Sequence, residues 1–406
     1  MARRRGSARD GGVLGYVAAV ASTDLEPFFF DEAAAVADHE RRMRRVQAEA
    51  VLHQRRKAAL DRICEYDPRN DSTYFSRFHF VDPGTFDLDE ESPLGPMRET
   101  DASIDVRGTL CEEGTKQFLP DDCANILASD GGKQFIPSDS TNLLSVKIPS
   151  KDGSKRFIPC YSVNVLTVKI VSSDVGFGID VYGTVIARDS IDLKCVYLFR
   201  RDRDHPQLIL SKILTGPKRG LALKCDIYFE IDLKIKGDRR RKDKQLSKGY
   251  LLLDGVPLRL EDEMVVESDT LDTKLSKVVI TYAVVKYAVE ATFAIEVLQG
   301  RFYGEITACT TSIRDSIVLY DSKVAEPMTG NGKGVIQMLR NVVAVCLKEK
   351  LMMTITARTG DGKTKITTIK FTPGVNGGGE KEITCGSIKM CVKVTWSIIS
   401  RKYLYP

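Results

Sequence analysis

The chain has 406 residues, 43% of them hydrophobic and 28% charged, and its formal net charge is +5. This length and apolar fraction suffice for two or three domains with real cores, while ten cysteines are too few for a disulfide scaffold. The charge excess does not by itself indicate nucleic acid binding, and no stretch approaches the roughly 20 apolar residues of a membrane span.

Residues 1–30 are predicted to be a disordered N-terminus. Three arginines at 3–5 and an apolar run at 13–21 imitate a secretory signal, but the run contains glycine and tyrosine and polar residues separate it from the arginines. Several cysteines lie inside strand patterns, where reduced thiols pack as small hydrophobes. We therefore predict a cytoplasmic or nuclear protein with free cysteines rather than a secreted one.

Residues 31–66 are predicted to form one basic helix, because the segment is rich in Ala, Arg, Glu and Gln and lacks Gly and Pro. The cations that we assign as candidate contacts for nucleic acid or another partner are Arg41, Arg42, Arg44, Arg45, Arg55 and Arg56. Charge runs usually form solvated faces, and the apolar seam is weak for a coiled coil. We favour a solvated helix and retain binding to RNA or a ribosome as the alternative.

Residues 67–162 are predicted to be a linker that contains a repeated phrase. A Lys, then Gln or Arg, Phe, Ile or Leu, and Pro recur at 116–120, 133–137 and 155–159, and an Asn with an apolar run follows each copy. The last copy leads into the first strand of the next region. Tandem duplication of that strand and its lead-in explains the pattern.

Residues 163–402 are predicted to form a β-rich domain built from an internal repeat, about 163–285 and 286–402. Strand patterns in the first half return in the second with matching spacing: Val196 to Leu221 and Val318 to Val343 both span 25 residues. Apolar and polar residues alternate within them, which indicates strands with one buried face. The fold class is therefore mainly β, a sandwich-like region of two related strand units after a long N-terminal helix.

Two further features are candidate sites. Four aspartates in loops and strand ends, Asp174, Asp180, Asp202 and Asp204, resemble oxygen ligands for calcium, but neighbouring arginines oppose a divalent cation, so we assign no metal and no cofactor. A basic loop between two predicted strands is a candidate phosphate contact. It comprises Arg239, Arg240, Arg241 and Lys242, and its lack of aromatic residues favours a solvated hairpin tip.

Several stretches resemble a known family. They include VNVLTVKIVSSDVGFGIDVYGTVIARDS, LTGPKRGLAL, VEATFAIEVLQGRFYGEITACT and the closing VTWSII, together with the lead-in RICEYDPRNDSTYFSRFHFVDPGTFDLDEESPLGPMRETD. The first four resemble the grass-expanded plant domain of unknown function that also forms the C-terminal part of the cereal jasmonate-induced ribosome-inactivating protein, and the lead-in resembles the stretch that precedes this domain in many of its stand-alone members. The resemblance implies a plant protein with a β-rich fold and a role in stress or defence, and it implies no known activity.

The ribosome-inactivating activity of that cereal protein belongs to a separate N-glycosidase domain, which the segment upstream of residue 163 is too short to hold. The phrase Val289 to Thr292 superficially resembles a Glu-Ala motif but lies in a strand pattern without the required Arg, and the only tryptophan, Trp396, belongs to the alternating final strand. A hydrolase triad needs a histidine beside a nucleophile, and the β-rich region contains only His205, which lies in a polar loop. We predict a non-enzymatic interaction protein with a protein partner.

Overall fold

The computed structural model describes residues 31–67, 71–82, 84–96, 146–148, 155–157, 159–209, 212–213, 216–237, 242–260, 264–273, 275–323, 334–358 and 363–399. The chain divides into two compact units, Met1–Arg55 and Arg56–Pro406. The predicted N-terminal segment 1–30, most of the linker repeats, and Arg239, Arg240 and Arg241 lie outside the described residues. Among the residues described, we find no helix with the length and apolar character needed to cross a membrane.

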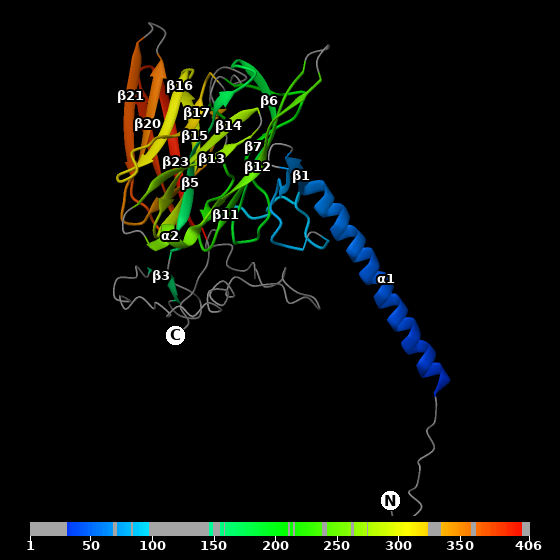
Figure 1. The fold of residues 1–406 in the computed structure, drawn as a ribbon. Helices are drawn as coiled ribbons and strands as arrows, with labels where there is room; N and C mark the ends of the chain where they lie inside the picture. The colour runs from blue at the N-terminus through cyan, green and yellow to red at the C-terminus, as the bar shows by residue number, and fades with distance from the viewer. Residues whose placement is uncertain are drawn as a thin grey trace, which may run out of the picture. The chain divides into compact units, whose positions relative to one another are not determined.

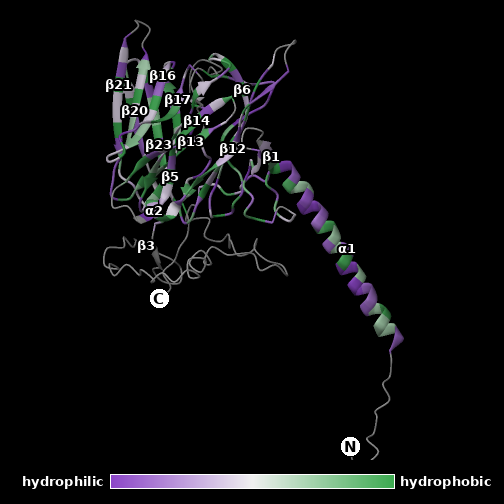
Figure 2. Cartoon of the chain, viewed as in Figure 1, coloured by the Kyte–Doolittle hydropathy of each residue, from purple (hydrophilic) through white to green (hydrophobic). Residues whose placement is uncertain are grey.

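Helix α1 (Glu32–Ile63) carries the arginine-rich sequence. Asp31 caps its first turn, because the Asp31 carboxylate accepts a hydrogen bond of 3.0 Å from the backbone amide of Ala34. Asp38 pairs one turn onward with Arg41 and Arg42. Figure 2 shows a mostly hydrophilic helix with scattered apolar residues, and its single buried residue is Ile63.

The helix ends three residues before the predicted boundary. Residues 64–66, which we assign to the helix, belong instead to strand β1 (Cys64–Asp67), which pairs in antiparallel register with β2 (Ser72–Phe75). The backbone amide of Ser76 donates to the carbonyl of Ile63 at 2.7 Å, so the returning strand satisfies an open carbonyl at the helix end. The pairing with β2 therefore competes with continuation of the helix.

Two antiparallel sheets form the first sandwich (Figure 1). Sheet I has the order β10-β5-β14-β13, with β9 also paired to β5, and sheet II has the order β12-β11-β6-β7, with β8 also paired to β6. The strands of sheet I are β5 (Ser162–Ser173), β9 (Lys212–Ile213), β10 (Leu221–Ala222), β13 (Val266–Asp272) and β14 (Ser276–Val285). Those of sheet II are β6 (Ile179–Arg188), β7 (Val196–Arg201), β8 (Gln207–Ile209), β11 (Ile227–Ile235) and β12 (Lys244–Leu253), and helix α2 (Gly255–Leu260) follows β12.

The second sandwich repeats this arrangement. Sheet III has the order β18-β15-β23-β22, with β19 also paired to β15, and sheet IV has the order β17-β16-β20-β21. The strands of sheet III are β15 (Ala288–Gln299), β18 (Gly334–Val335), β19 (Val342–Cys346), β22 (Gly378–Cys385) and β23 (Ile388–Ile398). Those of sheet IV are β16 (Gly304–Thr310), β17 (Ile317–Asp321), β20 (Leu351–Arg358) and β21 (Thr364–Phe371). The prediction of a mainly β, sandwich-like fold from two related strand units is confirmed.

Each sandwich has its own apolar core, and the core of the second extends onto sheet I through residues of β5, β10 and β14. In the first, side chains from sheets I and II share one buried cluster, and the rings of Phe229 on β11 and Tyr282 on β14 stack with centroids 6.4 Å apart. In the second, sheets III and IV share a larger cluster that includes Trp396, which is 4% exposed. The sequence places Trp396 in the alternating final strand, and in the structure it lies in β23 with its side chain in the core.

The sandwiches are joined by polar contacts that run in both directions. Buried Asn164 on β5 accepts a hydrogen bond from the Ala344 amide of β19 at 2.9 Å and donates to the Ala344 carbonyl at 2.7 Å. In return, Glu290 on β15 accepts a hydrogen bond from the Gly220 amide at 2.5 Å. Arg340 lies at the same junction and donates to the carbonyls of Val165 and Val342. Burial lowers the pKa of Arg340 to about 10.

A Tyr-Gly pair recurs at the second strand of each repeat, within β6 and at the start of β16, and the glycine is needed there. Gly183 has φ +118°, and a Cβ at this position would overlap the carbonyl oxygen of Asp232 on the paired strand β11. Gly304 has φ +154°, and its Cβ would overlap the carbonyl oxygen of Thr356 on β20. Both repeats therefore exclude a side chain at the same point of close strand approach.

Substitution of Gly183 by alanine is expected to destabilise the protein more than Gly178→Ala. Gly178 has φ +86° with no atom within 4 Å of an added Cβ, so Gly178→Ala introduces only the conformational strain, about 1–2 kcal/mol. Gly183→Ala adds a backbone clash, and we expect at least about twice that loss in urea unfolding. Equal losses for the two variants would contradict the clash.

The described part of the predicted linker is structured. Strands β3 (Val146–Ile148) and β4 (Lys155–Phe157) form a small antiparallel pair, and the second contains the Lys-Arg-Phe of the last repeated phrase. Residues 71–82 and 84–96 pack against the first sandwich through Phe78 and Leu88, which join a small cluster with Ile63. This packed segment positions the candidate site.

Candidate functional site

The outer face of sheet II carries charged residues that are buried. On β11 the core-facing residues include Phe229 and Ile231, so the alternation places Glu230 on the opposite, outer face. Glu230 is nevertheless 3% exposed, and Arg188 at the end of β6 is fully buried. An outer-face residue is buried only when another part of the chain covers it. Here the covering part is residues 75–82 and 84–92, which we term the cover segment.

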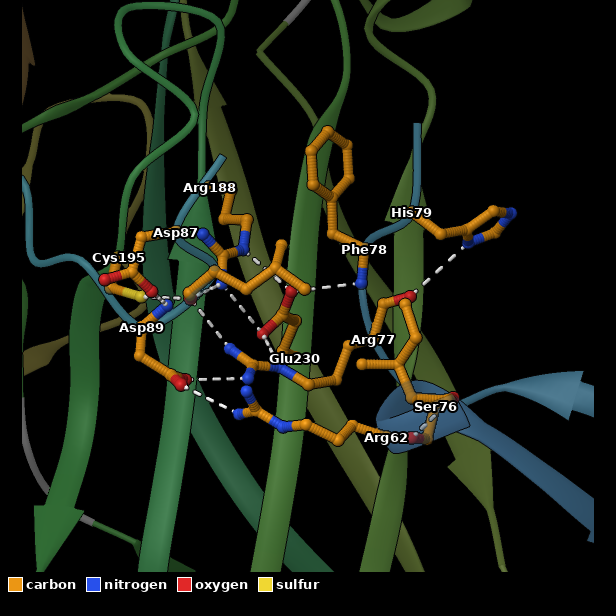
Figure 3. Close-up of polar contacts among 12 residues, drawn as sticks. Arg62, Ser76, Arg77, Phe78, His79, Asp87, Asp89, Arg188, Cys195 and Glu230 are labelled. Carbon is orange, nitrogen blue, oxygen red and sulfur yellow. Dashed lines mark hydrogen bonds and ion pairs between the residues drawn. The ribbon is translucent and has the colours of Figure 1, made fainter. Parts of the chain in front are cut away.

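Glu230 is the centre of an ionic cluster (Figure 3). Its Oε1 accepts hydrogen bonds from Arg188 Nε at 2.7 Å and from the backbone amide of Phe78 at 3.0 Å. Its Oε2 accepts from Arg77 Nε at 2.9 Å and from Arg188 Nη2 at 3.1 Å. One carboxylate therefore joins β11 and β6 to the cover segment and has four donors around it.

The carbonyl of Leu88 is a second junction. It accepts hydrogen bonds from Arg77 Nη2 at 2.8 Å and Arg188 Nη2 at 2.5 Å, and the Cys195 thiol donates to it at 3.2 Å. Arg77 Nη1 also donates to Asp89 Oδ1 at 2.7 Å. The cover segment is thus anchored at two points. Near residue 78 it binds Glu230, and near residue 88 its Leu88 carbonyl binds Arg188.

The charges of this cluster stabilise one another. Burial alone would raise the pKa of Glu230, but hydrogen bonds and charge from Arg188, charge from Arg77 and the Phe78 amide hold that pKa below its usual range. Burial likewise opposes the charged form of Arg77, and Glu230 and Asp89 raise the pKa of Arg77 in spite of it. Glu230 and Arg77 are therefore ionised together and act as fixed charges.

The Cys195 thiol is expected to resist alkylation in the folded protein. Burial raises the pKa of Cys195, and the thiolate is the reactive form. Cys64 is exposed and is a matched internal control. We expect iodoacetamide at pH 8 to modify Cys64 while Cys195 stays unmodified until denaturant is added, as measured by peptide mass spectrometry. Equal rates at the two cysteines in the native protein would show that Cys195 is accessible.

A second buried ion pair lies where the cover segment ends. Arg219, 2% exposed, donates to both carboxylate oxygens of Asp189 at 2.6 and 3.0 Å, and Asp189 also accepts from the Ala222 amide at 2.8 Å. Ser92, at the end of the cover segment, donates through Oγ to Asp192 Oδ2 at 2.6 Å. Arg219 Nη2 reaches the other Asp192 oxygen at 3.3 Å.

Aromatic rings gather around the first half of the cover segment. His79 stacks between Phe75 and Phe80, with ring centroids 4.1 and 4.4 Å away. Phe80 also packs on Tyr228 of β11 at 5.5 Å, yet it stays 61% exposed. The cover segment therefore presents the largely exposed ring of Phe80, which packs on the rings of His79 and Tyr228.

The charged groups of this site hold one another and the backbone of the cover segment. The carboxylates of Glu230 and Asp189 accept hydrogen bonds from arginine and backbone donors, and the nearby thiol is kept protonated. Backbone pairing, ion pairs and apolar packing together are the interactions by which sheets bind extended peptides.

The structure does not bring together the four aspartates considered as candidate calcium ligands. Asp174, Asp180, Asp202 and Asp204 are all exposed, and within the described residues no group of three or more His, Cys, Asp or Glu is placed to hold a metal. His205 is exposed in the turn after β7 and donates its backbone amide to the Asp202 carbonyl at 3.1 Å.

The cations predicted as candidate binding residues differ in their partners and exposure. Arg44 pairs with Glu40, as Arg41 and Arg42 do with Asp38, within α1. Arg45 and Arg55 are exposed on the same helix, as is Lys242 before β12. Arg56 instead donates twice to Asp82 of the cover segment, at 2.7 and 2.5 Å, which makes it part of the second unit.

The sequence patterns missed the residues of the ionic cluster. Alternation in β11 assigns Glu230 to a polar face and does not show that a distant segment covers that face. The one available signal was the lead-in over residues 62–101, whose resemblance to the stretch that precedes this domain in related proteins implied that the two belong together.

Comparison with known proteins gives one family. Residues 162–394 match the domain of unknown function DUF6598, which is more than half of the chain. No curated protein matches. Among solved structures, the chain is similar to the C2A and C2B domains of Extended-Synaptotagmin 2, with 8% identity over 63% of this chain and 97% of that chain and a TM-score of 0.21.

A second similar structure is human GIVD cytosolic phospholipase A2 in complex with methyl gamma-linolenyl fluorophosphonate. The identity is 8%, the TM-score is 0.19, and the match covers 58% of this chain and 32% of that chain, so it spans about a third of the enzyme. TM-scores of this size do not carry a conclusion about fold or function.

Proposed function

The chain belongs to the DUF6598 family, a family of unknown function, and we propose that it is a non-enzymatic interaction protein whose sheet II binds polypeptide segments. The observation that carries this proposal is the cover segment itself. Residues 75–82 and 84–92 bind the outer face of sheet II through a buried carboxylate, two buried or half-buried arginines and packed rings. The sheet thus holds a polypeptide by side-chain chemistry that another protein can also supply.

The exposed ring of Phe80 is the proposed first contact with a partner. Aromatic side chains on a rigid base are frequent anchors of protein interfaces. Phe80 rests on Tyr228 and His79, so little side-chain freedom is lost when a partner covers it. As the resemblance to the cereal protein implies, we propose that such partners act in a plant stress or defence response.

Site-specific crosslinking tests this function. A photoreactive phenylalanine analogue is placed at Phe80 in one variant and at Ile366, 67% exposed on β21 of the second sandwich, in a matched control. We expect a discrete protein adduct from position 80 and none of the same mass from position 366, in extracts of cells that express the protein. No adduct at 80, or the same adducts at both positions, would contradict binding at sheet II.

RNA or ribosome binding through α1 is a second candidate, favoured by the exposed cations of that helix. Arg45 and Arg55 are exposed, and they lie among six other cations in 32 residues. Co-sedimentation with ribosomes and with free RNA across a salt series tests it. RNA contacts predict an affinity that falls steeply with salt, with a slope that decreases by about 0.7 for each lost single-strand phosphate contact in an Arg45→Gln, Arg55→Gln variant.

A further inference from the structure

The last part of the cover segment pairs with the edge of sheet II. Strand β7 is the outer strand of the sheet order, and residue Cys195 directly precedes it. The Ser92 amide donates to the Cys195 carbonyl and the Cys195 amide donates to the Glu90 carbonyl, both at 2.9 Å, in a parallel bridge. We term residues 88–92 the strap. The strap therefore makes one parallel bridge to the sheet edge, with the backbone hydrogen bonding that an added strand uses in peptide recognition.

The strap and its acceptor are complementary in charge. Glu90 pairs with Lys194 at 2.6 Å, and Glu91 pairs with Lys218 at 2.8 Å and Arg200 at 3.5 Å. These cations come from the segment between β6 and β7, from β7 and from the segment before β10, and they meet at one edge. An extended acidic peptide is the ligand that such an edge recognises.

Two side chains fix the register of the strap. Leu88 is 8% exposed and packs with Phe78 and Ile63, and Ser92 is fully buried with its hydroxyl on Asp192. Between them the side chains of Glu90 and Glu91 remain 48% and 43% exposed. The ligand pattern is thus an apolar residue, three acidic residues and a serine, with the acidic groups on the accessible side.

The strap is held less firmly than the rest of the cover segment. The ion pairs of Glu90 and Glu91 are partly or largely exposed, and exposed pairs contribute little to stability. The contacts around Phe78, in contrast, involve the buried Glu230 and Arg188. Opening of the strap breaks the hydrogen bonds at the Leu88 carbonyl and at Asp89, while Glu230 keeps its bonds to Arg188, Arg77 and the Phe78 amide.

We propose that this edge of sheet II is a binding site for acidic peptides, and that the strap occupies it as an intramolecular competitor. The proposal rests on the proposed function and names its ligand class. A partner segment with the strap's pattern binds as a parallel strand beside Cys195 and places its carboxylates on Lys194, Lys218 and Arg200. Displacement of the strap is then the step that opens the site.

A labelled peptide with the sequence of residues 86–93, FDLDEESP, tests the proposal on the full-length protein. The variant Glu90→Gln, Glu91→Gln weakens the strap and leaves the acceptor intact. We expect this variant to bind the peptide about tenfold more tightly than the unsubstituted protein, as measured by fluorescence anisotropy. Addition of Lys194→Gln and Lys218→Gln is expected to remove the gain, and a peptide with glutamines at both Glu positions is expected to bind weakly to every variant.

Absence of peptide binding to the Glu90→Gln, Glu91→Gln variant, with its thermal midpoint unchanged, would overturn the proposal. Equal affinity for the acidic and the glutamine peptide would overturn it as well. If crosslinks form at position 80 while the peptide fails to bind, the acidic site is wrong and the proposed function stands. If neither result appears, both fail.

Discussion

The substitution Glu230→Gln is expected to lower the free energy of unfolding by about 3–5 kcal/mol, the loss typical of a broken buried ion pair. The change removes the negative charge opposite Arg188, which is fully buried, and Arg77. It also replaces an accepting oxygen with an amide donor among four donors. Urea unfolding followed by circular dichroism measures the loss.

Asp232→Asn is the matched control. Asp232 lies two residues onward on the same face of β11, is only partly buried, and accepts a hydrogen bond from Gln245 at 2.8 Å. We expect this variant to lose less than about 1 kcal/mol. Similar losses for the two variants would mean that the ionic cluster does not hold the cover segment.

The same carboxylate predicts a pH dependence. The folded-state pKa of Glu230 lies below its usual value, so the unfolded chain binds this proton more readily. The stability from Glu230 is therefore fully present above the unfolded pKa, about 4.3, and is lost as the pH falls through the folded pKa. Glu230→Gln is expected to flatten this acid limb of the stability curve relative to Asp232→Asn. An identical acid limb in the two variants would argue against the shift.

The substitution Asp189→Asn is expected to cost a similar amount, about 3–5 kcal/mol. Asp189 is fully buried and accepts hydrogen bonds from both terminal nitrogens of Arg219, from Ala222 and from Ile191. Loss of the charge leaves Arg219 with its partly buried neighbour Asp192 at 3.3 Å. The measurement is again the free energy of unfolding in urea.

Asp192→Asn serves as the control for this second pair. Its side chain is 16% exposed, and an asparagine keeps an oxygen for the Ser92 hydroxyl. We expect a loss well below that of Asp189→Asn. A larger loss for Asp192→Asn would mean that the contact of Asp192 with the strap stabilises the protein more than the ion pair of Asp189 with Arg219 does.

The repeat shows how far the sequence predicts this fold. Matching strand spacings predicted two related units, and the Tyr-Gly pairs at 183 and 304 mark the same strand approach in both sheets. The order of strands within each sheet could not be read from spacing, because pairing between distant strands leaves no local signal. Helix α1 was predicted from composition, and only its last turn was misassigned because β2 pairs with residues 64–67.

The site could be predicted only in part. Charge runs pointed to the α1 arginines, and of these Arg56 proved to be an intramolecular partner of Asp82. Glu230 and Arg188 did not stand out, since single polar residues in alternating strands are ordinarily solvated. Their burial depends on contacts between residues a hundred or more positions apart in the chain, such as Arg188 with Leu88 and Phe78 with Glu230. Periodicity carries no information about contacts of this kind.

Hydrogen exchange at single residues tests most directly whether sheet II holds the strap as a replaceable polypeptide. The relevant amides are those of Ser92 and Cys195, which pair the strap with the sheet edge, and that of Ile231 in the centre of β11. Separate opening of the strap predicts that the Ser92 and Cys195 amides exchange far faster than Ile231 under native conditions. Exchange of all three only through global unfolding would show that the strap is an inseparable part of the fold and would contradict the account.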